Sequence, residues 1–180
     1  MVYILLGTGF EEIEAVSPCD ILRRGGVEVQ FAGIGGTLVT GGNGITVQAD
    51  CAVEDMDLDA MEMVVLPGGM GGVRSMLASD AAMNAVKTAY AQGKFVTAIC
   101  AAPTILAKLG ITDGKHATVY PGMEEQMGSA MMEDVNAIRD GKVLTGRAPG
   151  AALEFGYLLL ETLKGTEVME KVRSGMVYKG

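Results

Sequence analysis

Cys100 is the residue of this 180-residue chain whose surroundings best suit chemistry. It follows residues 95–99, an apolar and β-branched run that predicts a buried strand, and it precedes a helix expected to begin near Pro103. A thiol at such a turn lies beside the unpaired N–H groups of a helix N-terminus, which stabilise a thiolate and lower the thiol pKa. The pattern predicts a nucleophile elbow with cysteine in place of serine, although a free cysteine is more often a small buried apolar residue.

Two further segments are expected to reach the same edge of the fold as Cys100. Residues 7–14 and residues 67–72 each follow a short apolar run of strand length. Because the carboxyl ends of parallel strands meet at one edge of an α/β sheet, where ligands bind, both segments should lie near the thiol. Glu14 would be partly buried there with a raised pKa, and once protonated it could donate a hydrogen bond to a thiolate. The helix dipole alone also explains an acidic residue in a first helical turn.

The segment of residues 67–72, Pro-Gly-Gly-Met-Gly-Gly, has few side chains that could block a substrate. Its backbone N–H groups could form an anion-binding nest and, with the N–H of Ala101, an oxyanion hole beside Cys100. Glycine richness alone equally favours a flexible loop.

The other reactive side chains fit structural roles better. His116 is the only histidine, and four residues of strand would hold it about 13 Å from Tyr120, too far along the strand to act as a base. Cys19 and Cys51 lack a helix N-terminus beside them, so both are expected to be structural.

Four methionines follow the predicted strand that ends at Tyr120. The helical spacing of Met123, Met127 and Met131 predicts one face of a helix or a lid, with Met132 next to it. Adaptable packing is the main interpretation of these side chains, and oxidation sensing is the alternative.

Composition excludes several classes of function. The net charge is -8, whereas nucleic-acid surfaces need clustered Lys and Arg, so no nucleic-acid partner is expected. No apolar run is long enough to span a bilayer and the N-terminus lacks signal-peptide features, so we expect no membrane association and a cytoplasmic location.

Glu12 stands where a dinucleotide fingerprint has its third glycine, and no Walker A pattern occurs. An odd number of cysteines and a single histidine predict neither disulfides nor a metal site.

Strands alternate with helices along the chain, which predicts one α/β domain over residues 1–180 with a mainly parallel sheet. The predicted strands are 2–6, 27–32, 63–66, 95–99 and 118–120. The predicted helices are 11–24, 79–92, the one that follows residue 100, 149–163 and 166–174. Two hairpins are expected, over 37–47 and 136–144.

Six motifs occur in order along nearly the whole chain. They are Glu11-Glu12-Ile13-Glu14-Ala15-Val16, Asp20 with Arg23-Arg24-Gly25-Gly26, Val65-Leu66-Pro67-Gly68-Gly69, Ala98-Ile99-Cys100-Ala101-Ala102-Pro103, Leu144-Thr145-Gly146-Arg147-Ala148-Pro149-Gly150, and Glu154-Phe155. Each is weak by itself, but the ordered set resembles the ThiJ/PfpI superfamily, on the branch of the parkinsonism-associated deglycase.

The resemblance implies a flavodoxin-like three-layer α/β sandwich, a homodimer and no cofactor. It implies that Cys100 is the reactive nucleophile, that Glu14 is its hydrogen-bonding partner, and that the backbone amides of Gly69 and Ala101 lie at the thiolate. It also implies that Arg24 helps to hold the dimer and the pocket region, and Gly68 belongs to the same pocket.

This chain departs from the resemblance at two positions. Tyr120 stands where branch members often have histidine, and with a pKa of about 10 it cannot act as a base at neutral pH. Tyr120 could still donate a hydrogen bond to a substrate oxygen. Some relatives have an arginine near the position of Asn43, so an anion contact made by that arginine is not expected here.

The resemblance implies a cysteine-dependent enzyme of glyoxalase or deglycase type, which acts on a small carbonyl substrate such as methylglyoxal or its adducts. An oxidation-sensitive thiol is expected with it. The alternative is a redox-sensing, stress-response protein or a chaperone without a dedicated metabolic substrate, since sensing and catalysis need the same thiolate.

Overall fold

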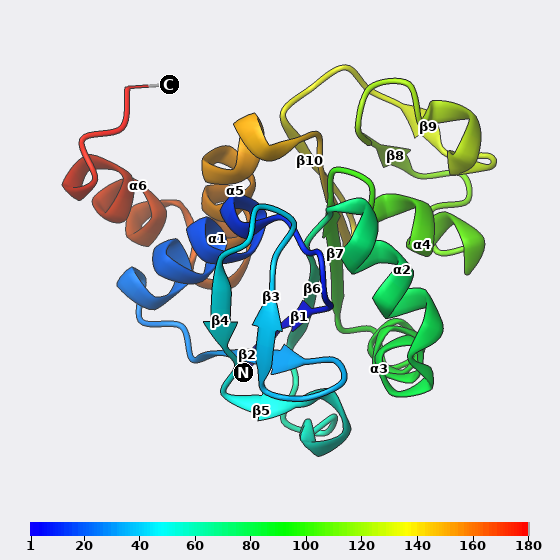
Figure 1. The fold of residues 1–180 in the computed structure, drawn as a ribbon. Coiled ribbons are helices and arrows are strands. Elements are labelled where there is room, and N and C mark those ends of the chain that lie inside the picture. The colour runs from blue at the N-terminus through cyan, green and yellow to red at the C-terminus, as the bar shows by residue number, and fades with distance from the viewer. Residues whose placement is uncertain (180) are drawn as a thin grey trace.

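A computed structural model describes residues 1–179 of the chain as a central sheet between two helical layers (Figure 1). The sheet consists of β1 (Val2–Leu6), β2 (Val29–Gly33), β5 (Cys51–Ala52), β6 (Met63–Leu66), β7 (Phe95–Ile99), β10 (Ala137–Asp140) and β11 (Val143–Gly146). Two small pairs lie beside it, β3 (Leu38–Thr40) with β4 (Thr46–Gln48), and β8 (His116–Ala117) with β9 (Met131–Met132). The helices are α1 (Glu12–Arg24), α2 (Met70–Ala78), α3 (Asp80–Ala91), α4 (Pro103–Lys108), α5 (Ala152–Lys164) and α6 (Thr166–Gly175). Short 3-10 turns cover Val53–Asp55, Glu124–Met127 and Pro149–Ala151.

The strand order is β10-β11-β7-β6-β1-β2-β5, and only the β10–β11 pair is antiparallel. Every residue of β1, β6 and β7 is buried. Helices cover both faces of a parallel sheet, so its central strands must be apolar throughout rather than alternating. The predicted three-layer α/β fold with a mainly parallel sheet is confirmed.

The crossovers position the site. Helix α1 lies with α5 and α6 on one face of the sheet, and α2 and α3 lie on the other (Figure 1). The loops after β1 and β6 therefore diverge at the carboxyl edge of the sheet, where α/β proteins bind ligands. In the β6–β7 register Leu66 pairs with Ala98. Gly68 and Cys100, each two residues further along, consequently leave the sheet side by side.

Most predicted elements are confirmed, including both hairpins. The Ser79 side chain accepts a hydrogen bond from the N–H of Ala82 at 3.2 Å and caps α3, as its position before that helix predicts. No helix among the described residues is both long and apolar enough to cross a membrane.

Three expectations about local structure are wrong. The glycine-rich segment is not a plain loop, because α2 begins inside it at Met70. The strand expected at residues 118–120 lies slightly earlier, at His116–Ala117. The spaced methionines share no helix face: a 3-10 turn ends at Met127, Gly128 follows with φ 62°, and Met131 belongs to a strand.

Candidate active site

The backbone at Cys100 turns sharply between β7 and the segment that leads into α4. Its φ is 66°, a left-handed conformation that non-glycine residues rarely adopt. The N–H of Cys100 donates to the Gly146 carbonyl at 2.9 Å, and its carbonyl accepts from the N–H of Tyr120 at 2.9 Å. Such a conformation costs about 1–3 kcal/mol and persists only where neighbours hold it, which is typical of a nucleophile elbow.

Glu14 reaches the same turn from α1, and its side chain is completely buried. Its Oε2 atom accepts a hydrogen bond from the N–H of Gly68 at 2.7 Å. A Cβ added at Gly68 would lie 2.6 Å from Oε2 of Glu14 and 3.0 Å from Sγ of Cys100. Only glycine fits between these groups, so Gly68 lets the carboxyl group and the thiol approach each other. Oε1 of Glu14 has no hydrogen-bond partner within residues 1–179.

Backbone N–H groups surround the sulfur on its other side. The N–H groups of Gly69 and Ala101 hydrogen-bond to Cys100 and lower the pKa of its thiol. Gly69 has a φ of 77°, and a Cβ there would lie 2.4 Å from the carbonyl oxygen of Gly9. Glycine is therefore required to aim this N–H at the sulfur while the loop after β6 packs against the loop after β1.

The thiol and the carboxyl group shift each other's pKa. Burial raises the pKa of Glu14 to about 7, against hydrogen bonds from Cys100 and Gly68 that lower it. Burial also raises the pKa of the Cys100 thiol, and the neighbouring carboxylate raises it further, against the two backbone amides. The expectation that a helix end lowers this thiol pKa is therefore corrected, because loss of water and a nearby negative charge outweigh the amides. Two groups this close titrate as a pair.

Cys100 borders an open pocket of about 570 Å³ with a mainly apolar lining. The pocket is lined by Glu11, Gly69, Met70, Cys100, Ala101, Tyr120, Pro121, Met123 and Pro149. Since Cys100 is only 8% exposed, a reagent reaches its side chain through this pocket. Glu14 is not part of the lining and lies behind Gly68. The volume suits a small organic molecule.

A second buried carboxylate of α1, Glu12, lies next to this site and binds the β3–β4 hairpin. Glu12 Oε1 accepts from the backbone N–H groups of Asn43 at 2.8 Å and Ile45 at 3.3 Å, and Oε2 accepts from Asn43 Nδ2 at 2.8 Å. These bonds tie the β3–β4 turn to the start of α1. Burial raises the pKa of Glu12, but hydrogen bonds from Asn43 and Ile45 outweigh burial and the net direction is downward.

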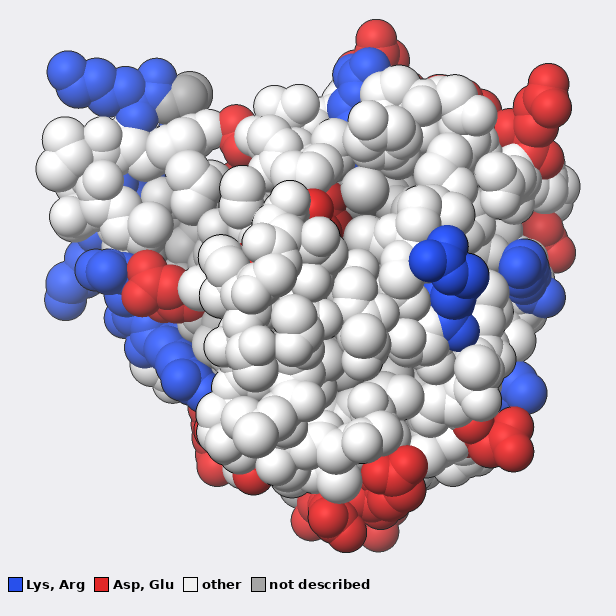
Figure 2. Space-filling model, viewed as in Figure 1, with Lys and Arg blue, Asp and Glu red and all other residues white. Residues whose placement is uncertain are grey.

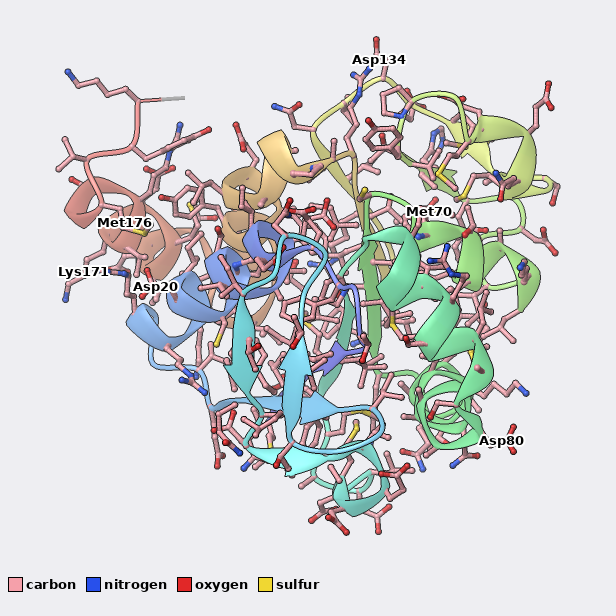
Figure 3. All side chains as sticks on the ribbon, in the orientation of Figure 1. Asp20, Met70, Asp80, Asp134, Lys171 and Met176 are labelled. Atoms are coloured by element: carbon pink, nitrogen blue, oxygen red, sulfur yellow. The ribbon has the colours of Figure 1, made fainter. Side chains whose placement is uncertain are left out.

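Arg24 does not belong to this pocket. It lies at the far end of α1, where ten residues of helix separate it from Glu14 by about 15 Å, and it pairs with Asp20 at 2.7 Å. Figure 3 shows Asp20 well apart from Met70, which lines the Cys100 pocket.

The remaining candidates also lie elsewhere. His116 pairs with Glu133 at 2.6 Å on an exposed surface. Cys19 is buried and its pKa is raised by burial to about 11, and burial raises the pKa of Cys51 as well. No group of three or more His, Cys, Asp or Glu side chains within residues 1–179 is placed to hold a metal ion.

Sequence reasoning missed several lining residues. Glu11 and Glu12 look like ordinary acids of a first helical turn, and only the packed hairpin shows that Glu12 is a clamp and Glu11 a pocket wall. Met70 and Pro149 enter the lining from elements remote in sequence. A signal for Met70 exists, since it follows Gly69 directly at the edge of the sheet.

This fold, with a cysteine elbow facing a buried glutamate, defines a known class of protein. The sequence pattern of the DJ-1/PfpI family matches residues 1–162, and the chain belongs to this family.

Individual relatives cover nearly the whole chain. Protein dj-1beta of Drosophila melanogaster is 36% identical over 177 residues, which are 97% of this chain and 95% of that protein. A protein named as a deglycase from Pyrococcus abyssi (strain GE5 / Orsay) is 34% identical over 151 residues, 83% of this chain and 90% of that protein. The solved structure of oxidized Toxoplasma gondii DJ-1 superposes on this chain with a TM-score of 0.95 and is 32% identical to it. The match covers 99% of this chain and 98% of that one.

Proposed function

We propose that this protein is a cysteine-dependent enzyme of glyoxalase or deglycase type, which acts on methylglyoxal or its adducts without a cofactor. The observation that carries the proposal is the arrangement at Gly68, where a buried carboxyl group and a thiol flank one glycine beside an open pocket. The deglycase name of the archaeal relative supports the same class of reaction.

The proposed reaction begins with attack of the Cys100 thiolate on the aldehyde carbon of methylglyoxal, which gives a hemithioacetal. The backbone N–H groups of Gly69 and Ala101 stabilise the negative charge that develops on oxygen. Glu14 then removes the proton from the former aldehyde carbon and returns a proton to the neighbouring carbon, which leaves a lactoyl thioester. Water hydrolyses the thioester, and lactate and the free thiol are released.

The protonation state of Glu14 affects how readily the Cys100 thiol loses its proton. Burial is the largest cause that raises the pKa of the Cys100 thiol, ionised Glu14 raises it further, and the two backbone amides lower it. A proton on Glu14 removes the repulsion, so that burial alone then opposes the stabilisation of the thiolate by the amides. Because burial raises the pKa of Glu14 to about 7, the carboxyl group can hold that proton and release it near neutral pH, as a proton-transferring group must.

The test compares turnover of methylglyoxal to lactate by the wild type, Cys100→Ala and Glu14→Gln. We expect no measurable turnover with Cys100→Ala and a loss of at least 100-fold with Glu14→Gln. Equal rates in all three proteins would exclude the proposal.

A redox-responsive role of Cys100 is the second candidate, and the thiol held by backbone amides favours it. Burial raises the pKa of both thiols, to about 12 at Cys100 and to about 11 at Cys19, so it is the backbone N–H groups and the open pocket beside Cys100, rather than its pKa, that distinguish it. Mild peroxide should therefore add two oxygens at Cys100, giving a sulfinic acid, before it modifies Cys19 or Cys51. Peptide mass spectrometry measures the order, and earlier oxidation of either other cysteine contradicts this role.

We also propose a homodimer through the outer face of α1 and the β3–β4 hairpin. Ile13 and Val16 on α1 and Leu38 and Ile45 on the hairpin are exposed, Leu38 by 71%. Glu12 joins the two elements through its bonds to the hairpin turn. Figure 2 shows this side as largely uncharged, with acidic and basic groups gathered around its edges. Such a patch is typical of a protein interface.

Sedimentation equilibrium tests the dimer. The wild type should have twice the mass of one chain, and Ile13→Glu, which places a charge in the patch, should shift the mass toward that of the monomer. A monomeric wild type at micromolar concentration contradicts the proposal.

A further inference from the structure

The Cys100 pocket carries a negative charge that nothing in its own lining neutralises. Glu11 is the only acidic side chain among the described residues that line it, and none of them is Lys, Arg or His. The rest of the lining is mainly apolar, with Met70, Met123 and Pro149 among its walls. A ligand in this pocket therefore meets apolar surface and one carboxylate.

Glu11 is held in place by groups that do not cancel its charge. Nδ2 of Asn43 donates to Oε1 and Oε2 of Glu11 at 3.3 and 3.4 Å, and an amide side chain brings no positive charge. The backbone N–H of Glu11 donates to the carbonyl of Gly68 at 3.1 Å. This bond fixes Glu11 to the glycine that separates Glu14 from Cys100.

The charge of Glu11 is felt at the reacting groups. It raises the pKa of Glu14, although burial is the larger cause of that shift. A negative group on a substrate in the same pocket would meet the same field. At about 4–6 Å in a partly hydrated site, two like charges repel strongly enough to change binding by roughly tenfold.

We infer that Glu11 is a specificity-determining residue which admits uncharged 2-oxoaldehydes to Cys100 and rejects those that carry a carboxylate or a phosphate. The inference names the substrate class and rests on the proposed glyoxalase function. The reaction it selects adds one water to each 2-oxoaldehyde: the aldehyde carbon is oxidised to a carboxylate, and the neighbouring ketone carbon is reduced to an alcohol.

A matched pair of substrates tests the substrate class. The anion 4,5-dioxopentanoate and its uncharged methyl ester share one reacting end and differ in charge at the other. The wild type should prefer the ester by roughly tenfold or more in kcat/KM. Glu11→Gln, which keeps the shape and the acceptor for Asn43, should reduce this preference by roughly tenfold.

Glu167→Gln is the matched control, since it makes the same change in net charge on α6, where Glu167 is exposed. This variant should keep the wild-type preference for the ester. Equal use of acid and ester by the wild type, or an unchanged preference in Glu11→Gln, would overturn the inference.

Alkylation of Cys100 separates this inference from the proposed function, because it needs no turnover. Iodoacetamide is uncharged and iodoacetate is an anion, and each reaction is followed at Cys100 by peptide mass spectrometry. After normalisation to glutathione, the wild type should react roughly tenfold faster with iodoacetamide, and Glu11→Gln should lose most of this difference.

The two experiments fail in different ways. If neither 2-oxoaldehyde is turned over while alkylation shows the Glu11-dependent preference, the glyoxalase proposal fails and the charge selection stands. If alkylation shows no preference, or one that Glu11→Gln leaves intact, the charge selection fails whatever the enzyme turns over.

Discussion

Glu12 and Glu14 lie two residues apart on α1 and are both buried, with 5% and 0% of their surfaces exposed, yet their pKa values move in opposite directions. Burial raises the pKa of both. Three hydrogen bonds from Asn43 and Ile45 stabilise the Glu12 carboxylate and outweigh burial. Glu14 accepts one N–H bond, from Gly68, and its other oxygen has no partner among the described residues.

The difference shows that hydrogen-bond donors, rather than depth, decide what a buried carboxyl group can do. A carboxylate with several donors stays ionised and serves as a clamp between elements. A carboxyl group with too few donors is costly to ionise, so it keeps a proton that it can give away. Glu12 therefore fits a structural role and Glu14 a chemical one.

The largest expected effect is on catalysis. In the proposed reaction Glu14 moves the proton, so Glu14→Gln should lower kcat for methylglyoxal by at least 100-fold. Glu12→Gln should lower kcat far less, because its contribution is to hold the hairpin turn. Lactate formation under single-turnover and steady-state conditions measures both. A Glu12 variant that loses as much activity as the Glu14 variant would break the distinction.

The pH dependence of stability should separate the same two residues. Glu14 has a folded pKa of about 7 against an ordinary value of 4.5, so between these pH values the folded state binds the proton more tightly. Stability should therefore fall as the pH rises through this window, by up to about 3 kcal/mol, and Glu14→Gln should abolish that fall. Urea unfolding at pH 4.5 to 7.5 measures it.

The contribution of Glu12 to stability depends on pH in the opposite direction. The folded pKa of Glu12 is lowered from 4.5, so its stabilising contribution is present above that value and is lost as the pH falls through the folded pKa. Glu12→Gln should consequently keep the fall in stability between pH 4.5 and 7 and weaken the protein's loss of stability in acid. If Glu12→Gln flattened the neutral window instead, the assignment of that window to Glu14 would be wrong.

The next smaller effect is on stability, when the side chain of Glu12 that holds the hairpin turn is removed. Glu12→Ala leaves the N–H groups of Asn43 and Ile45 without their acceptor, which should lower the free energy of unfolding at pH 7 by about 2–3 kcal/mol. Chemical denaturation measures this change. Glu14→Ala is the comparison, and it should cost less at pH 7, because it removes a carboxyl group whose burial is unfavourable when ionised.

The smallest effect is expected at Asn43, whose side chain donates a hydrogen bond to Glu12. Asn43→Ala removes the Nδ2 donor but keeps the backbone N–H bond to Glu12. Stability should fall by about 1 kcal/mol, and the loss should largely disappear in a Glu12→Ala background, because the two residues share one interaction. Additive losses in the double mutant would show that Asn43 acts through something other than Glu12.

Elements with a strong local pattern could be predicted from the sequence. β1, β6 and β7 are uniformly apolar because both of their faces are covered, and this pattern is visible in a single run of residues. Their parallel arrangement then brings residues 7–14, residues 67–72 and Cys100 to one edge, and the structure confirms this convergence.

Elements that depend on close packing could not be predicted. Glycines disfavour helices, so the start of α2 at Met70 runs against local propensity. A Cβ at Gly71 would lie 2.8 Å from Cα of Gly9, and a Cβ at Gly72 would lie 2.8 Å from Cα of Phe10. These glycines let the helix approach the loop after β1, and only the tertiary structure shows that contact.

The sequence by itself determined the layered α/β fold and the thiol at a strand–helix turn, because the periodicity and turn residues that specify them are local. Only the tertiary structure decided how the pKa values of the two site residues, Cys100 and Glu14, are shifted. The pKa shifts of Cys100 and Glu14 depend on lost water and on donors contributed by residues 54 or more positions away from Glu14, such as Gly68. The same holds for Arg24, which belongs to one of the six ordered motifs but lies at the end of α1 far from the pocket.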